Sequence, residues 1–299
     1  MQERFYTRNC EITPTTPWPE GMQRIALGVE YNGRDFHGFQ VQPGGVPTVQ
    51  GYLHQALSKV ACEPITLICA GRTDAGVHAT AQVVHFDTLA VRPEKAWVLG
   101  ARPHLPEGVG VRWARAVSNS FHARFSARSR AYRYLISDGE SRPALLHDQV
   151  TWVRHKLDAE AMAVAAQGLV GEHDFTSYRA AQCQAHSPVR LVEHIHLSRR
   201  GDLIVLEIKA NAFLHHMVRN IVGVLLEVGR GARPITWPVE VLKARERAAA
   251  AATARPNGLY LASVDYPAHL DLPRVSPGPL FIADPIGQLA ERVGCSNIG

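Results

Sequence analysis

The chain has 299 residues, of which 46% are hydrophobic, and its formal net charge is +5. This is enough apolar material for one large or two medium-sized cores, and the mild basic excess permits a polyanionic partner. No apolar run reaches membrane-spanning length, and residues 1–18 lack the apolar stretch of a secretory signal.

Residues 1–21 contain three prolines and Gly21, and we expect them to form a flexible extension. The segment that follows is predicted to contain six elements, identified by apolar alternation in strands and apolar stripes in helices. In chain order they are strand 24–31, a helix over 49–60 capped by Thr48, strand 65–69, strand 81–86, helix 93–101 and strand 109–116.

The second half repeats this order with one additional helix. Tyr132, Tyr134 and Ile136 alternate along its first strand and are expected on one face. Its elements are strand 130–137, helix 158–169, strands 190–199 and 203–209 around a Gly201-Asp202 turn, helix 214–228, helix 239–250 and strand 259–265.

Both halves therefore follow the order β-α-β-β-α-β, which is typical of a ferredoxin-like unit with a largely antiparallel sheet. We predict an α+β fold. Its parts are the extension 1–21, a half over 22–117, a second half over 118–270 and a tail over 271–299 that ends in a short helix or a frayed segment.

Five cysteines are scattered along the chain without a CxxC pair, which favours reduced thiols and a cytoplasmic location. They are Cys10, Cys62, Cys69, Cys183 and Cys295.

Residues 70–79 read Ala-Gly-Arg-Thr-Asp-Ala-Gly-Val-His-Ala and place Asp74 between two glycines, with Arg72 two positions before it. A hairpin loop whose aspartate satisfies its own backbone would look similar. However, the loop is longer than a tight hairpin needs, and a neighbouring guanidinium would hold the carboxylate ionised. An ionised carboxylate suits a nucleophile or a base, so Asp74 is the candidate catalytic residue.

Residues 71–78 resemble the active-site signature of the TruA family of tRNA pseudouridine synthases, and the likeness extends over residues 23–267 and 278–281. It implies two sheets joined at a central basic cleft with helices packed on one side. It also implies isomerisation of uridine to pseudouridine at tRNA positions 38 to 40, with Asp74 acting on a flipped-out uridine. No cofactor or metal is implied, and the expected partners are the tRNA anticodon stem-loop and a second copy of the chain.

The resemblance also suggests substrate-binding residues. Arg72 would help to hold the flipped nucleotide, although it would serve equally as a structural partner of Asp74. Tyr132 would stack on the uracil, whereas composition alone favours a core aromatic. Arg219 would pair with Asp74, and Leu259 would form an apolar pocket wall, with Leu261 as the rival for that place.

Tyr132 lies in a segment that mixes arginines with aromatic residues, a pattern suited to phosphate contact and base stacking. The residues in question are Phe121, Arg124, Phe125, Arg128, Arg130, Tyr132, Arg133 and Tyr134.

A metal site is not expected. His215 and His216 are adjacent, so on a helix they would point in different directions, and the strand pair His194 and His196 has no evident third ligand.

Two other functions stay open: a non-catalytic RNA-binding protein or tRNA chaperone on the same scaffold, and a carboxylate-dependent hydrolase.

Arg102 and His104 depart from the asparagines that many family members carry before Leu105-Pro106.

Overall fold

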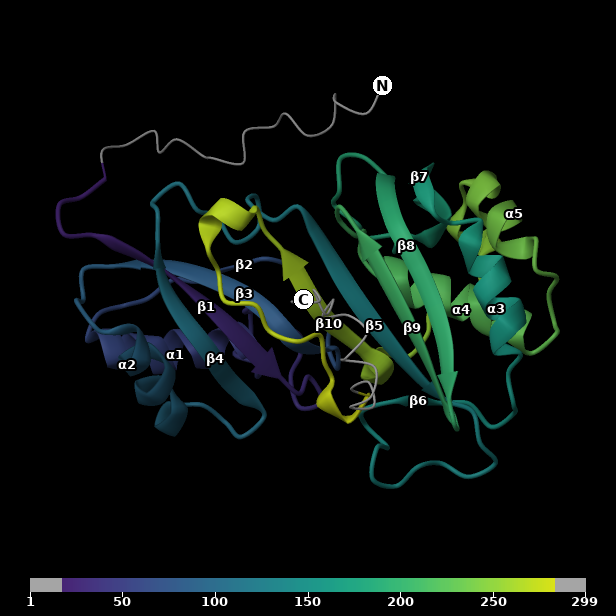
Figure 1. Cartoon of the computed structure of the whole chain (residues 1–299), viewed down its shortest axis with the longest axis horizontal. Coiled ribbons are helices and arrows are strands. Elements are labelled where there is room, and N and C mark those ends of the chain that lie inside the picture. The colour runs from purple at the N-terminus through teal and green to yellow at the C-terminus, as the bar shows by residue number, and fades with distance from the viewer. Residues whose placement is uncertain (1–17, 283–299) are drawn as a thin grey trace, which may run out of the picture.

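The computed structural model describes residues 18–282, which form one mixed sheet with helices packed against it (Figure 1). The expected short helix after residue 284, most of the N-terminal extension, Cys10 and Cys295 lie outside these residues. The strands are β1 (Gln23–Tyr31), β2 (Ile68–Cys69), β3 (His78–Thr88), β4 (Val109–Val117), β5 (Ser129–Ser137), β6 (Thr151–Trp152), β7 (Gly171–Asp174), β8 (Val189–Arg200), β9 (Leu203–Ala210) and β10 (Leu259–Asp265). The helices are α1 (Val49–Ala61), α2 (Glu94–Ala101), α3 (Ala159–Gln167), α4 (Met217–Gly229) and α5 (Trp237–Ala244).

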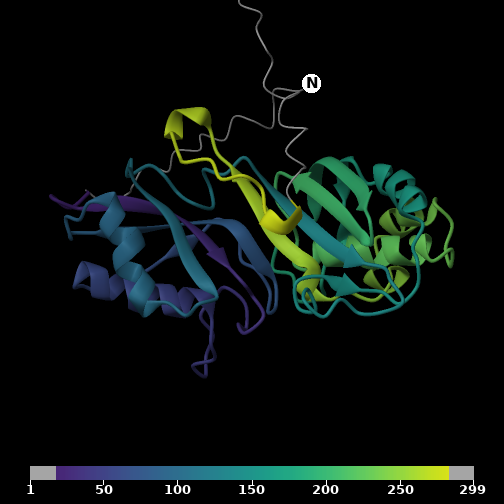
Figure 2. The ribbon, with the colours of Figure 1, turned by 60° about the horizontal axis from the view of Figure 1, so that its bottom comes forward.

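The strand order across the sheet is β4-β1-β3-β10-β5-β9-β8-β7, with β2 paired to β3 and β6 paired to β5. Pairing is antiparallel except for β5 with β6 and for β3 with β10. The prediction of an α+β fold with a mainly antiparallel sheet is confirmed. The last strand, β10, lies at the centre and joins the two halves (Figure 2). It pairs with β3 through Tyr260 with His78 and Leu261 with Ala79.

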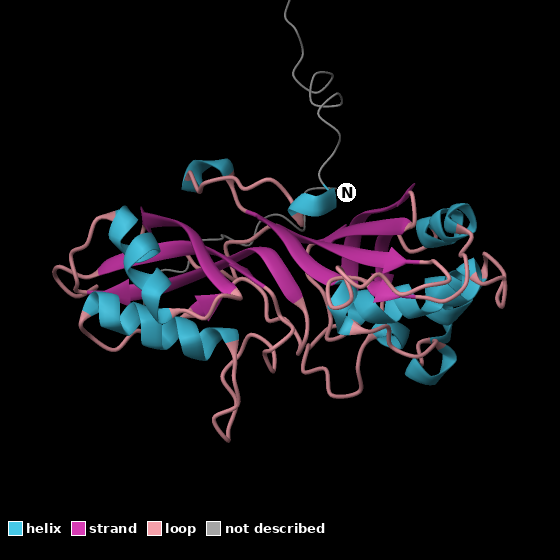
Figure 3. Cartoon of the chain, turned by 90° about the horizontal axis from the view of Figure 1, so that it is seen from below, coloured by secondary structure: helices cyan, strands magenta, loops and turns pink. Residues whose placement is uncertain are grey.

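The helices of the two halves lie mainly on one face of this sheet, where most of the core is buried (Figure 3). Tyr132, Tyr134 and Ile136 of β5 all point into that core, as their alternation predicted. A smaller cluster around Phe121 fills part of the opposite face, which the chain before β5 and after β10 covers.

Most predicted elements match the structure within two residues, including β10 at 259–265 and the Thr48 cap of α1. Strand 65–69 shrinks to two residues because α1 side chains satisfy the earlier backbone groups: Ile65 N–H donates to Ser58 and Leu67 N–H to His54. Helix α5 ends at Ala244, six residues early, where Arg245 adopts a left-handed φ of 51°. The short strands β6 and β7 were not predicted.

Cys62, Cys69 and Cys183 are free thiols, as expected. Within residues 18–282, no helix combines the length and the apolar character needed to cross a membrane.

A buried ion pair links the end of β5 to β8, across the intervening strand β9. The Asp138 carboxylate, fully buried just after β5, accepts hydrogen bonds from two Arg199 nitrogens at 2.8 and 2.7 Å and from Leu157 N–H at 2.9 Å. Burial acts to raise the pKa of Asp138, but the hydrogen bonds from Arg199 and Leu157 outweigh it and hold the pKa below its usual value.

We expect Asp138→Asn to lower the free energy of unfolding at pH 7 by about 2–4 kcal/mol, because it leaves a guanidinium without its buried counter-charge. The carboxylate with the lowered pKa contributes stability above its unfolded pKa of about 4, and this contribution is lost as the pH falls through the folded value. In urea unfolding, the difference in the free energy of unfolding between the variant and the parent should therefore become smaller at acidic pH. Asp202→Asn, at an exposed carboxylate, should change little; an equal loss in both variants contradicts the assignment.

Candidate active site

Asp74 lies in residues 70–77, the Asp74 loop, which connects β2 to β3 at the junction of the two halves. Its side chain is 24% exposed, so the carboxylate is open to a ligand. The loop belongs to the first half, and the basic side chains that contact Asp74 come from the second.

Buried polar side chains fix the start of the loop. Gln82 on β3 donates to the Gly71 carbonyl at 2.6 Å and accepts from the Gly71 N–H at 3.4 Å. The Tyr31 hydroxyl lies 2.7 Å from the Thr73 hydroxyl and also accepts from Gln82. Because these groups are paired in the interior, the loop has few alternative conformations.

Residues 36–39 brace the loop through its backbone. Phe39 N–H donates to the Thr73 carbonyl, and Gly76 N–H donates to the Phe36 carbonyl. Gly38 has a φ of 91°, and a side chain there would begin 2.8 Å from the Thr73 carbonyl oxygen. Only glycine combines this conformation with so close an approach.

Arg219 and two histidines surround the Asp74 carboxylate. Arg219 Nη1 lies 3.2 Å from Oδ2 and His216 Nε2 lies 3.3 Å from the same oxygen, while His215 Nε2 lies 3.3 Å from Oδ1. Arg219 is 13% exposed and its Nε donates to the Ala254 carbonyl, which fixes the guanidinium. Arg219 contacts Asp74, as predicted, whereas the contacts of His215 and His216 with this carboxylate were not predicted.

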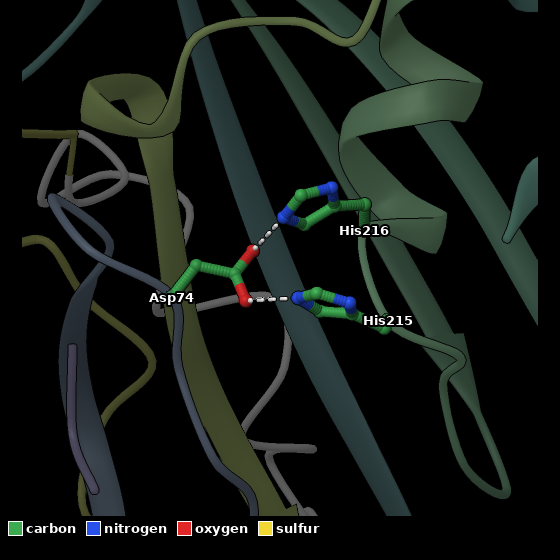
Figure 4. A group of neighbouring side chains, drawn as sticks. All are labelled: Asp74, His215 and His216. Atoms are coloured by element: carbon green, nitrogen blue, oxygen red, sulfur yellow. Dashed lines mark ion pairs between the residues drawn. The ribbon is translucent and has the colours of Figure 1, made fainter. Parts of the chain in front are cut away.

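The expectation that adjacent histidines diverge was wrong for His215 and His216. Helix α4 begins at Met217, three residues later than predicted, because His216 adopts a left-handed φ of 61° at the N-cap. Both rings therefore turn toward Asp74, with centroids 4.0 Å apart (Figure 4).

Arg72 does not neutralise Asp74 as its place in the sequence suggested. Its side chain is exposed, and within residues 18–282 it forms no ion pair with Asp74. Side chains two positions apart in an extended loop need not converge, and the counter-charge comes from Arg219, 145 residues away.

Tyr132 is buried beside the Asp74 loop. Its hydroxyl lies 3.8 Å from the position that a Cβ of Gly71 would occupy, and its ring packs edge-on against Phe213 at 5.0 Å. Burial raises the pKa of Tyr132, and the negative charge of Asp74 raises it further, so the hydroxyl stays protonated at neutral pH. Among the described residues this hydroxyl has no hydrogen-bond partner, and it is therefore available to a ligand.

The four arginines of the 121–134 segment have different surroundings. Arg124 and Arg128 are exposed, and Phe125 beside Arg124 is 56% exposed. Arg133 forms an ion pair with Glu207 at 2.8 Å. Arg130 is buried and donates to the carbonyls of Ala70, Arg124, Ala127 and Asn211 at 2.6–3.4 Å. The expectation of phosphate contact is therefore wrong for Arg130, which instead ties three segments of the site together.

Leu259 and its rival Leu261 are both buried in the main core. In the sheet, Leu259 pairs with Tyr134 and Leu261 pairs with Tyr132, so Leu261 is the closer neighbour of the tyrosine beside the site.

A family model described as tRNA pseudouridine synthase matches residues 28–126 and 165–267 of this chain. The protein called tRNA pseudouridine synthase A in Pseudomonas aeruginosa is 57% identical over 263 residues, covering 88% of this chain and 92% of the relative. Proteins of that name from Yersinia pseudotuberculosis and Shewanella sp. MR-4 are 57% and 56% identical, cover 88% and 87% of this chain, and are matched over their full length. A solved Cbf5-Nop10-Gar1 complex is 14% identical with a TM-score of 0.32, covers 68% of this chain and 45% of that chain, and is too distant to carry an argument.

We expect Arg130→Lys to loosen the Asp74 loop, because an ammonium group cannot donate to four carbonyls in three directions. Amide hydrogen exchange at residues 71–76 should become roughly tenfold faster or more, equivalent to at least about 1.4 kcal/mol of lost protection. Arg133→Lys, three residues along the same strand, is the matched control and should leave exchange in the loop at the parental rate. Unchanged exchange in the Arg130 variant would contradict the role of this side chain.

Proposed function

The chain belongs to the family of tRNA pseudouridine synthases, and on that basis we propose that it isomerises uridine at positions 38, 39 and 40 of the anticodon arm of tRNA. The reaction breaks the N1–C1′ bond and forms a C5–C1′ bond. One proton leaves C5 and one is gained at N1. Because the product is an isomer, no net oxidation or reduction occurs and the balance requires no co-substrate.

Asp74 is the proposed catalytic residue. The observation that carries this proposal is a partly exposed carboxylate, on a braced loop, that faces one guanidinium and two imidazoles from the other half. Such groups stabilise its negative charge without sealing it from a ligand. The carboxylate can attack the ribose or the base, or remove a ribose proton, and each route requires the ionised form.

Tyr132 and Leu259 are proposed to contact the flipped uracil, with Leu261 also near the tyrosine. The free hydroxyl and the ring of Tyr132 beside Gly71 support stacking or a hydrogen bond to the base. Flipping is required because the reacting atoms are shielded within a stacked stem.

Arg72, Arg124 and Arg128 are proposed to contact RNA phosphates. All three side chains are exposed, and Phe125 offers an aromatic surface next to Arg124. Arg72 has no counter-charge in Asp74, which favours its proposed role at the nucleotide.

We also propose a homodimer in which each tRNA contacts both subunits, and a cytoplasmic location, which the free thiols support. Sedimentation of the active protein tests the dimer, and a fully active monomer would refute it.

Asp74→Asn should reduce pseudouridine formation by about 10²–10⁴-fold or more, because the amide can act neither as nucleophile nor as base. The measurement is incubation with an unmodified anticodon stem-loop, followed by mapping of pseudouridine at each position. Asp202→Asn, at an exposed turn of the second half, is the control and should retain parental activity.

If the Asp74→Asn variant formed pseudouridine at the parental rate, the assignment of Asp74 as the catalytic residue would be wrong. Binding of the stem-loop by the parent without any pseudouridine would favour a non-catalytic RNA-binding protein. Pseudouridine outside positions 38 to 40 would overturn the proposed target.

Tyr132→Ala should reduce the rate far more than Tyr132→Phe if the ring acts by stacking, which is worth about 1–3 kcal/mol per base. Single-turnover rates for both variants, with binding measured by fluorescence anisotropy, provide the comparison. Comparable losses would instead assign the function to the hydroxyl.

A further inference from the structure

Asp74, His215 and His216 together form a set of metal-ligand atoms that converge on one point. The two Nε2 atoms each lie 3.3 Å from a carboxylate oxygen, and the ligand atoms of the three residues are all within 4.8 Å of one another (Figure 4). The left-handed conformation of His216 creates this arrangement, because it ends the loop before α4 with both rings on one side.

Two imidazoles and a carboxylate are ligands that suit Zn²⁺ and similar transition ions. Around a tetrahedral ion with bonds of about 2.0–2.1 Å, ligand atoms lie about 3.3–3.4 Å apart. The 3.3 Å separation between His215 Nε2 and Asp74 Oδ1 agrees with this value, and the His216 nitrogen lies within 4.8 Å of the other two ligand atoms. Since Asp74 and His215 are partly exposed, water can supply the remaining ligand.

We infer that this set binds Zn²⁺ when RNA is absent, and that zinc and the target uridine exclude each other because both require the Asp74 carboxylate. The exclusion rests on the proposed function, whereas the binding site itself does not. The site would be inhibitory, in an enzyme whose reaction needs no metal.

Arg219 limits the affinity of the site. Its guanidinium lies 3.2 Å from Asp74 Oδ2 and repels a cation there, so zinc should bind mainly through Oδ1 and the imidazoles. We expect weaker binding than at a closed structural zinc site, which has four protein ligands. Mg²⁺ prefers oxygen ligands and should not compete.

The binding test is calorimetric titration of the metal-free full-length protein with ZnCl₂, without RNA. His215→Ala and His216→Asn should each weaken the zinc affinity at this site by tenfold or more. Asparagine tolerates a left-handed φ, so the start of α4 is preserved in the second variant. His194→Ala is the matched control, because His194 also lies 3.3 Å from a carboxylate oxygen, in Glu207, and should leave the affinity unchanged.

Absence of binding, or binding that neither active-site variant weakens, would overturn the inference. Cobalt substitution provides a second readout: the parent should give the visible absorption of a tetrahedral Co²⁺ site, and the His216 variant should lose it. An octahedral spectrum that is identical in both would also overturn it.

The exclusion is tested by assaying stem-loop conversion with rising ZnCl₂. Zinc should inhibit in competition with the stem-loop, a chelator should restore activity, and equal MgCl₂ should not inhibit. Inhibition that excess stem-loop does not relieve would refute the exclusion. If Asp74→Asn remained active while zinc still bound the parent through both histidines, the proposed function would fail and the metal site would stand.

Discussion

The contact between Asp74 and Arg219 is the interaction on which the site depends. The carboxylate comes from a loop of the first half, and the guanidinium comes from α4 of the second, 145 residues further on. Neither half alone contains both charges. The parallel pairing of β3 with β10 brings the halves together directly beside this contact, since the pairing begins at His78, four residues after Asp74.

A buried polar network then restricts where the carboxylate can lie. Three buried side chains bind residues 70–73: Gln82 and Arg130 bind the backbone, and Tyr31 binds the Thr73 hydroxyl. Gly38 allows the segment 36–39 to pack closely against the Thr73 carbonyl. Burying such groups is unfavourable unless each has a partner, so the network favours one arrangement over its alternatives. Reacting groups benefit from this because small displacements reduce the rate strongly.

Local patterns in the sequence predicted most of the fold, because alternation and helical stripes report which side of an element is buried. They failed where one residue changes the backbone direction, as at His216 and Arg245, since nothing in the apolar pattern marks a left-handed φ. The Asp74 motif was recognisable from its neighbours. Gln82 and the histidine pair were not, because a glutamine in an apolar strand and two adjacent histidines acquire a role only through residues that are distant in sequence.

The central position of β10 also bears on how the protein is made. Ribosomes deliver the N-terminal half first, yet the strand that fills the gap between β3 and β5 is the last of the ten to be synthesised. Until residues 259–265 emerge, the stretches of β3 and β5 that pair with β10 have no partner strand, and unpaired strand edges are templates for association with other chains. Premature termination before this strand would therefore produce an aggregation-prone fragment whose two halves are not joined, rather than a slightly shortened enzyme.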